Sequence, residues 1–346
     1  MTREHIALYR KHRPETFADV VGQDHIVKTL ESSVEKREIV HAYLFSGSRG
    51  IGKTSVARIF ARAIGTSDND ITEIDAASNR RIDDARELRE TVSSLPFESE
   101  YKVYIIDEVH MLTKEAFNAL LKTLEEPPAH AIFILATTEL HKLPDTIVSR
   151  CQTFNFRRPT IAVVKELLTT VASKEKISLH PEAAHLLALI ADGSFRDALG
   201  NLQKISSSVS SGKITAKDVE EITGAPSTEL VNDILVAMVK KDADKGVEVF
   251  RKVQIENYDT KLFFERVIQK IRFVLLLRNS PRSEGYVKGE LSEEEYKFVK
   301  SLSENKDFVF SLDDLKTFLD ALDLSRVSAI KVFPLEVAFL DMINRE

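Results

Sequence analysis

The stretch Gly47-Ser48-Arg49-Gly50-Ile51-Gly52-Lys53-Thr54 matches the complete P-loop pattern, G-x-x-x-x-G-K-[ST]. An apolar run, residues 42–45, precedes it, and a helix-compatible stretch, residues 55–60, follows it. This order of strand, loop and helix distinguishes a phosphate-binding loop from a glycine-rich turn that binds no nucleotide. The stretch therefore predicts a nucleotide-binding α/β domain built around this loop.

The residue types in this loop suit a triphosphate. The glycines let successive backbone N–H groups turn inward, and the N-terminus of the following helix adds a positive dipole. We expect Lys53 to reach the β- and γ-phosphates and the Thr54 hydroxyl to bind magnesium. The sequence thus predicts binding of ATP or GTP. The predicted nucleotide-binding residues here are Gly47, Ser48, Arg49, Gly50, Ile51, Gly52, Lys53, Thr54 and Ser55.

The composition is that of a globular protein without a strong overall charge. With 346 residues the chain suggests two or three domains, and its 43% hydrophobic content is ample for a core. Its 48 basic and 54 acidic residues give a net charge of −6, so DNA contact would need a local basic face or several subunits acting together. The apolar runs are too short for a membrane span, and the N-terminus has no apolar signal region. We expect a cytoplasmic protein without membrane contact, and the single cysteine, Cys151, excludes an internal disulfide and a four-cysteine zinc site.

Short apolar stretches alternate with helical patterns over residues 1–157. This alternation predicts a parallel sheet covered by helices on both faces. The predicted strands are Ala42–Ser46, Ile71–Asp75, Val103–Asp107 and Ala131–Thr137. After residue 157 the strand signal ends, and we expect a small helical domain at 158–224 and a larger one at 225–346.

Several helix signals support this helical second half. Pro181 suits the first turn of a helix, and Thr215 is a plausible N-cap. Ser292 and Glu295 form a capping-box pattern. Residues 261–278 read as one long, largely buried helix, followed by a weak linker at 279–285.

A second signal bears on hydrolysis. The apolar run 103–106 ends in Asp107, which suits a magnesium-side carboxylate, and Glu108, which suits the base that orients the attacking water. Adjacent residues at a strand end point in different directions, so both roles are possible together. A solvated acidic turn is the ordinary alternative, but the P-loop upstream favours the hydrolytic interpretation.

Three further polar residues are candidates for the same chemistry. Thr138 ends another buried strand and suits a side chain that senses the γ-phosphate or its water. Arg150 and Arg196 could each place a guanidinium near a transferring phosphoryl group. Solvated surface charge is the alternative for both arginines, and composition does not choose between the two interpretations.

Several stretches also carry a resemblance to a known family. They are Tyr9–Pro14, Phe17–Gln23, Glu73–Asn79, Tyr104–Thr113 and Phe117–Pro128. Together they resemble clamp-loader ATPases, in particular the gamma/tau family of bacterial DNA polymerase III subunits. The similarity is dense from residue 9 to about residue 205 and weaker beyond.

The resemblance implies an AAA+ core at 1–157, a helical lid at 158–224 and a collar at 225–346 that assembles subunits into a ring. It implies an ATP hydrolase that uses magnesium and loads a sliding clamp on primed DNA during replication. The implied ring partners are copies of this chain and subunits of the delta and delta-prime types. Its family is grouped with DNA-directed DNA polymerase, a nucleotidyltransferase, as a holoenzyme subunit, although this chain itself is not expected to polymerise.

The resemblance also implies roles for individual residues. Arg150 matches the family's arginine finger, which acts on ATP in the neighbouring subunit, and Arg196 matches the lid arginine that contacts the phosphates. Thr138 matches the sensor position. The residues that match the adenine enclosure are Ala7, Tyr9, Arg10, Val20 and Val21. The positions matching helix N-termini that track the DNA backbone lie near Asn79, Arg81 and Lys122.

One departure from the family is large. Between the P-loop helix and the strand at Ile71–Asp75 the family usually carries four cysteines that bind structural zinc, whereas residues 63–71 of this chain contain none. A polar turn cannot replace four thiolates, so we expect no zinc. The long tail of the tau form is not expected in this chain either.

Two other functions stay open at this stage. A non-hydrolysing scaffold subunit of the same ring would lend Arg150 to a neighbour, but intact Lys53, Thr54, Asp107 and Glu108 argue against it. Another AAA+ DNA motor, such as a branch-migration helicase, would translocate on DNA without a clamp. The Ser149-Arg150-Cys151 motif and the collar-like C-terminus favour the loader.

Overall fold

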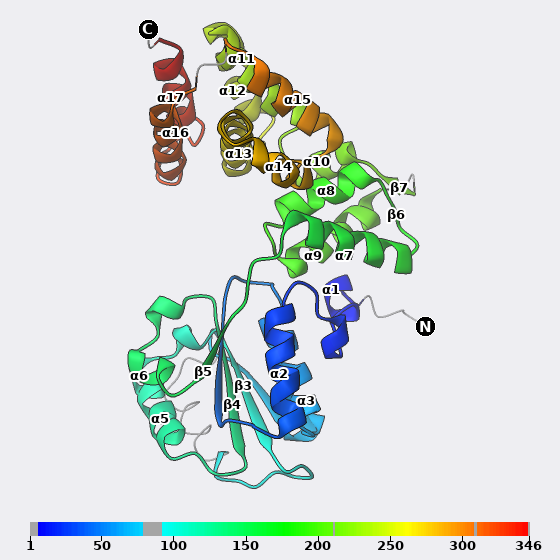
Figure 1. Ribbon diagram of the computed structural model, residues 1–346, viewed down its shortest axis with the longest axis vertical. Coiled ribbons are helices and arrows are strands. Elements are labelled where there is room, and N and C mark those ends of the chain that lie inside the picture. Colours follow the sequence, from blue (N-terminus) through cyan, green and yellow to red (C-terminus); the bar gives the residue numbers. More distant parts are fainter. Residues whose placement is uncertain (1–5, 79–91, 210–211, 308–309, 345–346) are drawn as a thin grey trace. The chain divides into compact units, whose positions relative to one another are not determined.

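The computed structural model describes residues 6–78, 92–209, 212–307 and 310–344 (Figure 1). The chain divides into two compact units. The first consists of Met1–Val164 with Gly193–Gly200, and the second of Lys165–Asp192 with Asn201–Glu346. Within the described ranges, no helix has both the length and the apolar character needed to cross a membrane.

The first unit contains a five-stranded parallel sheet in the order β2-β3-β4-β1-β5. Its strands are β1 (Ala42–Ser46), β2 (Ile71–Asp75), β3 (Lys102–Asp107), β4 (Ala131–Thr137) and β5 (Gln152–Asn155). The four predicted strands are confirmed, with β3 starting one residue earlier than expected. Because β4 lies between β3 and β1, the carboxyl ends of these three strands meet at one edge, and Ser46 pairs with Thr137 there.

Helices cover both faces of this sheet, which explains its continuous apolar strands. Every residue of β1 and β4 is buried. The helices α2 (Asp24–Lys36) and α3 (Lys53–Ala63) lie on one face, and α5 (Lys114–Glu125) and α6 (Asp145–Val148) on the other (Figure 1). Alternate residues of β1 pack on opposite faces of the sheet. Tyr43 packs in the hydrophobic core beneath α2 and α3, and Leu44 in the core beneath α5 and α6.

The edge strand β5 was not predicted from the sequence. Three of its four residues are exposed, and the fourth, Phe154, is buried. A strand at the edge of a sheet can be largely exposed and needs few buried side chains. The sequence of such a strand therefore lacks the apolar run from which a strand is predicted.

The second unit is mainly helical. Its helices, two of which begin in the first unit, are α7 (Ile161–Lys174), α8 (Pro181–Ile190), α9 (Phe195–Ser208), α10 (Ala216–Thr223), α11 (Thr228–Lys240), α12 (Ala243–Ile255), α13 (Thr260–Asn279), α14 (Glu284–Glu290), α15 (Glu293–Glu304), α16 (Leu312–Ser325) and α17 (Phe333–Asn344). A parallel pair of two-residue strands, β6 (Ser178–Leu179) and β7 (Lys213–Ile214), accompanies them and was not predicted.

The helix signals in the sequence have their expected structural counterparts. Pro181 is the first residue of α8, and the Thr215 hydroxyl accepts a hydrogen bond from Asp218 N at the start of α10. Ser292 and Glu295 form the capping box of α15. The expected linker at 279–285 differs: it forms a short 3-10 helix, Pro281–Ser283, and then enters α14.

Four charged or titratable side chains are buried together inside the second unit, and we call them the buried charge cluster: His185, Arg266, Lys270 and Glu295. Glu295 Oε1 lies 3.1 Å from Arg266 Nη2 and 3.2 Å from Lys270 Nζ, and its Oε2 lies 3.6 Å from His185 Nε2. Burial acts to raise the pKa of Glu295, but the surrounding positive charge outweighs it and lowers that pKa to about 2. Burial also lowers the pKa of Lys270 to about 8, against the pull of Glu295.

Candidate nucleotide-binding and hydrolysis site

The P-loop leaves β1 in a conformation that needs glycine. Gly47, Gly50 and Gly52 have φ angles of 144°, 74° and 103°, which side chains rarely tolerate. A Cβ atom on Gly47 would lie 2.8 Å from the carbonyl oxygen of Phe156. The loop is also tied to the neighbouring strand, because Gly47 N donates to Thr137 O at 3.2 Å. The backbone is therefore held in a tight cradle directly beside the end of β4.

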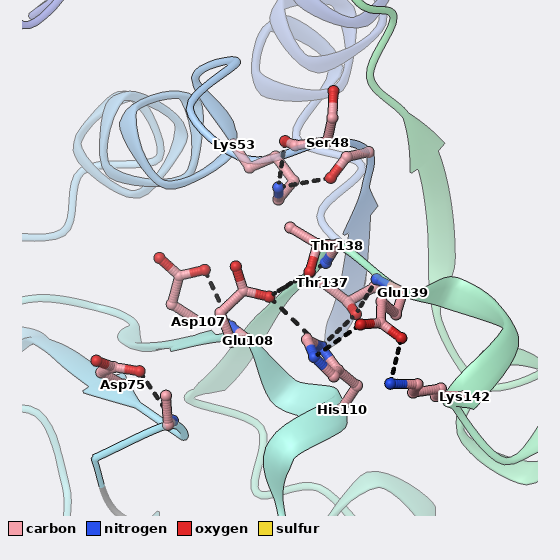
Figure 2. Close-up of polar contacts among 12 residues, drawn as sticks. Ser48, Lys53, Asp75, Asp107, Glu108, His110, Thr137, Thr138, Glu139 and Lys142 are labelled. Carbon is pink, nitrogen blue, oxygen red and sulfur yellow. Dashed lines mark hydrogen bonds and ion pairs between the residues drawn. The ribbon is translucent and has the colours of Figure 1, made fainter. Parts of the chain in front are cut away.

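Lys53 lies inside this cradle (Figure 2). Its Nζ donates to the carbonyl oxygens of Gly47 and Ser48 at 2.7 and 2.8 Å, and the residue is 5% exposed. Burial lowers the pKa of Lys53, while Glu108 and Asp107 act to raise it. A buried ammonium held by carbonyl dipoles inside a loop of backbone N–H groups is chemically suited to a polyphosphate.

Thr54 and Asp107 come together across the end of the sheet. The Thr54 hydroxyl donates to Asp107 Oδ2 at 2.8 Å. A hydroxyl and a carboxylate are oxygen ligands of the kind that Mg²⁺ prefers, usually with phosphate oxygens and water completing its shell. The described residues contain no group of three or more His, Cys, Asp or Glu side chains arranged to hold a metal by themselves. The pair thus fits a magnesium ion that is shared with a nucleotide.

Glu108 occupies an unusual backbone position. Its φ and ψ angles are 48° and 44°, in the left-handed region that residues with a side chain seldom adopt and that is often found at functional sites. Its Oε2 accepts hydrogen bonds from Thr138 N at 3.2 Å and Thr138 Oγ1 at 2.9 Å. The strand order brings these residues together, since β3 and β4 are neighbours. The structure thus places Thr138 beside Glu108, and its role as a sensor of the γ-phosphate or its water stays a prediction.

His110 adds a residue that the sequence analysis did not assign to the site. Its side chain is 6% exposed, and its Nδ1 lies 3.0 Å from Thr137 Oγ1 and 3.4 Å from Glu108 Oε2. Its Nε2 lies 4.0 Å from Glu139 Oε1 (Figure 2). Lys142 pairs with Glu139 and lowers its pKa. His110 belongs to the Tyr104–Thr113 stretch, but nothing in its spacing shows that it reaches Glu108.

Arg196 lies close to the P-loop within the first unit. Phe195 N donates to Gly50 O at 2.9 Å, which fixes the start of α9 against the loop. The guanidinium carbons of Arg196 and Arg10 each lie 5.9 Å from the centre of the Tyr9 ring. The structure therefore brings the predicted residues Tyr9, Arg10 and Arg196 together beside the phosphate cradle.

The other predicted adenine-side residues are near the N-terminal segment. Ala7 is the N-cap of α1 (Leu8–Lys11), and Val21 is exposed while Val20 is half-buried and packs against the core. Ser55 accepts a hydrogen bond from Arg13 Nε at 3.0 Å, which ties this segment to α3.

Gln23 was missed by the sequence analysis. It is fully buried, its Nε2 donates to Arg157 O at 2.6 Å, and its Oε1 accepts from Arg157 N at 3.0 Å. This reciprocal pair joins the N-terminal segment to the chain that leaves β5. Gln23 lies in the Phe17–Gln23 stretch, but no local pattern indicates its partner, which is 134 residues away.

Arg150 lies apart from this cluster. Its Nη2 pairs with Glu125 Oε1 at 2.7 Å and its Nη1 donates to Thr146 O at 2.8 Å. Within the described residues, none of its hydrogen bonds goes to the P-loop or to the end of β3. Lys122 is an exposed residue of α5, whereas Asn79 and Arg81 lie outside the described residues.

Asp70 organises the segment that precedes β2, where four cysteines are not found. This residue is 1% exposed and accepts hydrogen bonds from the backbone N–H groups of Phe97, Glu98 and Ser99. Burial acts to raise its pKa, but these donors outweigh it and lower the pKa to about 2. An ionised carboxylate thus ties residues 97–99 to the turn before β2.

Comparison with known proteins gives consistent matches along the chain. The family model described as DNA polymerase III, delta subunit, matches residues 22–80 and 66–160. The one described as DNA polymerase III clamp loader subunit, ATPase lid domain, matches residues 163–203.

Curated relatives cover most of the chain. It is 42% identical over 300 residues to DNA polymerase III subunit tau of Bacillus subtilis, a match that covers 81% of this chain and 53% of the relative. It is 37% identical over 285 residues to DNA polymerase III subunit gamma of Buchnera aphidicola subsp. Baizongia pistaciae, covering 76% of each chain. The chain spans about half the length of the tau-type relative.

A solved structure supports the fold. The Thermotoga maritima RuvB Holliday junction branch migration motor matches with a TM-score of 0.53 and 24% identity, covering 66% of this chain and 79% of that one. This likeness concerns the fold alone, and it agrees with the predicted α/β core followed by helical parts.

Proposed function

The chain belongs to the gamma/tau family of DNA polymerase III subunits, and from that premise we propose that it is an ATPase subunit of a clamp loader. Its substrate is ATP, used with magnesium to load a sliding clamp on primed DNA during replication. The proposed partners are copies of this chain, delta- and delta-prime-type subunits, the clamp and the DNA backbone. We propose that the protein acts in the cytoplasm, at replicating DNA.

One observation carries the proposal. The edge formed by β1, β3 and β4 holds Lys53 in the cradle, Thr54 against Asp107 and Glu108 against Thr138. A scaffold subunit that never hydrolyses ATP needs no such set of side chains. The arrangement therefore favours an active ATPase over the scaffold alternative.

The proposed mechanism assigns each group a task. Hydrolysis forms a bond from a water oxygen to the γ-phosphorus while the bond to ADP breaks. Lys53 binds the β- and γ-phosphates, and Glu108 orients the water and accepts its proton. Thr54 and Asp107 would hold magnesium, which when bound would supply charge neutralisation on the phosphates. Thr138 keeps Glu108 in place through two hydrogen bonds.

Arg150 and Arg196 complete the proposed site in different ways. Arg196 lies beside the P-loop of its own chain and is proposed to contact the phosphates. Arg150 is held by Glu125 away from that loop, and we propose that it acts on ATP bound by the neighbouring subunit. Because the arginine of one subunit would stabilise the transition-state charge in the site of its neighbour, hydrolysis would depend on ring assembly.

The family also supports a proposed division into an AAA+ core at 1–157, a lid at 158–224 and a collar at 225–346. The match of the lid-domain family to residues 163–203 supports the second part. DNA contacts near Asn79, Arg81 and Lys122 are proposed to be directed at phosphates, and structural zinc is proposed to be absent because the cysteines are.

The test is steady-state ATP turnover by the assembled loader with primed DNA and its clamp, comparing wild type with Glu108→Gln. We expect stimulated turnover in the wild type and a loss of about 10²–10⁴-fold in the variant, with ATP binding retained. A wild-type chain that adds no turnover to the complete loader would support the scaffold function. Translocation on DNA without any clamp would support the branch-migration alternative.

A further inference from the structure

Glu108 makes all its hydrogen bonds to the described residues through one carboxylate oxygen and its own backbone. Oε2 accepts from Thr138 N and Thr138 Oγ1 and lies 3.4 Å from His110 Nδ1. Oε1 makes no hydrogen bond to the part of the chain that the structure describes. Figure 2 shows dashed contacts at one carboxylate oxygen of Glu108. The other oxygen is therefore left to accept a hydrogen bond from water.

The surroundings of His110 define which nitrogen carries hydrogen. An ionised Glu108 can only accept, so a bare Nδ1 would face its Oε2 lone pair to lone pair. Thr137 Oγ1, the other neighbour of Nδ1, already accepts from Glu139 N at 3.0 Å and retains acceptor capacity. The hydrogen on Nδ1 therefore fits both neighbours.

Glu139 lies on the opposite side of the ring. Its Oε1 is 4.0 Å from His110 Nε2, and its backbone N–H binds the same Thr137 hydroxyl that faces Nδ1. Lys142 pairs with Glu139 and holds that carboxylate in the turn after β4. The His110 side chain is 6% exposed, and its Nδ1 is held beside Thr137 and Glu108, as expected for a group whose orientation matters.

We propose that His110 is a positioning residue for Glu108. Its Nδ1–H faces Oε2 and holds that oxygen together with Thr138, so that Oε1 is presented to the attacking water. Positioning is needed here because Glu108 projects from a left-handed backbone residue, at the end of a strand rather than within it. This inference rests on the proposed ATPase function, since it concerns the residue that orients the water.

Two variants separate the ring nitrogens. The side-chain amide of Asn can place an N–H near the position of Nδ1, whereas that of Gln reaches toward Nε2. We expect His110→Gln and His110→Ala to lower kcat by about 10–100-fold, the usual cost of removing a group that orients an active-site residue. The KM for ATP and the affinity for nucleotide should stay the same, and His110→Asn should recover most of the lost kcat. His141→Asn, at a side chain that is 79% exposed, is the matched control and should behave as wild type.

A second cycle removes Glu108 itself. If His110 acts through Glu108, His110→Gln should cause no further loss of turnover in a Glu108→Gln background. An equal loss in both backgrounds, or an Asn variant as slow as the Gln variant, would overturn the inference, as would a fall in melting temperature that accounts for the activity. These outcomes differ from failure of the proposed function, in which the wild-type loader would show no turnover that depends on Glu108.

Discussion

Ser194 closes so tightly over Gly50 that a Cβ atom on Gly50 would overlap the Ser194 hydroxyl. The next residue, Phe195, donates its backbone N–H to Gly50 O at 2.9 Å. The P-loop and the start of α9 are therefore joined by a contact in which glycine is required twice, for space and for its φ of 74°. The joint places Arg196 beside the cradle.

Gly50→Ala is expected to weaken ATP binding strongly by separating Ser194 from the loop. The matched control is Gly65→Ala, at a residue that also has positive φ (88°) but no heavy atom within 4 Å of an added Cβ. Gly65→Ala should carry the cost of backbone strain alone, about 1–2 kcal/mol of unfolding free energy, with nucleotide affinity unchanged. Calorimetric titration with ATP and urea unfolding of both variants measure the two effects. Equal ATP affinity in the two variants would show that the contact with Ser194 has no part in binding.

Arg150→Ala is expected to reduce stimulated ATP turnover of the assembled loader by about 10³–10⁵-fold while the variant chain still binds ATP. The physical reason is the loss of a guanidinium that compensates transition-state charge in the neighbouring site. Glu125→Gln is the matched control, because it releases the ion pair with Arg150 and keeps the guanidinium. Loss of ATP binding by the isolated Arg150→Ala chain would instead mean that the arginine acts within its own subunit.

The buried charge cluster predicts a pH dependence of stability. Burial lowers the pKa of His185 below its ordinary value, although Glu295 opposes the shift and Lys165, Arg266 and Lys270 reinforce it. As pH falls through about 6.5, the unfolded chain takes up a proton on this histidine before the folded chain does, so the free energy of unfolding decreases. Urea unfolding at about pH 7 and about pH 5 should show a smaller decrease for His185→Leu than for wild type. Removing the exposed His141 should leave the wild-type decrease unchanged, and an unchanged decrease in His185→Leu would contradict the prediction.

Asp70 predicts a metal-independent link between residues 97–99 and the turn before β2. Asp70→Asn should lower the unfolding free energy by about 2 kcal/mol at neutral pH, because it removes charge-assisted hydrogen bonds from the backbone of 97–99. Since the folded pKa is about 2, the contribution of the wild-type carboxylate should disappear as pH falls from about 4 toward 2. A strong chelator should leave the melting temperature of the wild type unchanged. A melting temperature that falls with chelator and recovers with zinc would show a metal site that these side chains do not provide.

Much of the fold follows from local sequence patterns. The strands β1 and β4 have the predicted bounds because strands buried on both faces are written as continuous apolar runs. Helix starts at Pro181, Thr215 and Ser292 follow from capping chemistry that acts within four residues. The polar edge strand β5 lacks such a signal, since its place in the sheet depends on pairing with β1.

The candidate site was predictable where a motif lies within one loop, and less so where partners come from different strands. The P-loop and Asp107-Glu108 were found from their patterns. The relationships of His110 with Glu139 and of Gln23 with Arg157 depend on strand order and register, because they join residues 29 to 134 positions apart. Arg196 was a candidate phosphate-binding residue from the sequence, but only the folded structure shows that it lies beside Tyr9.

The buried charge cluster has a mechanical consequence. Glu295 of α15 engages His185 of α8 and two cations of α13, and Arg266 in turn donates to Thr228 of α11 at 2.9 Å. Separating these helices would leave buried charges without their partners, which would cost several kcal/mol of free energy. Helices on both sides of residue 224 should therefore move together as one rigid body. A displacement of α8 should then be transmitted directly to α11, α13 and α15.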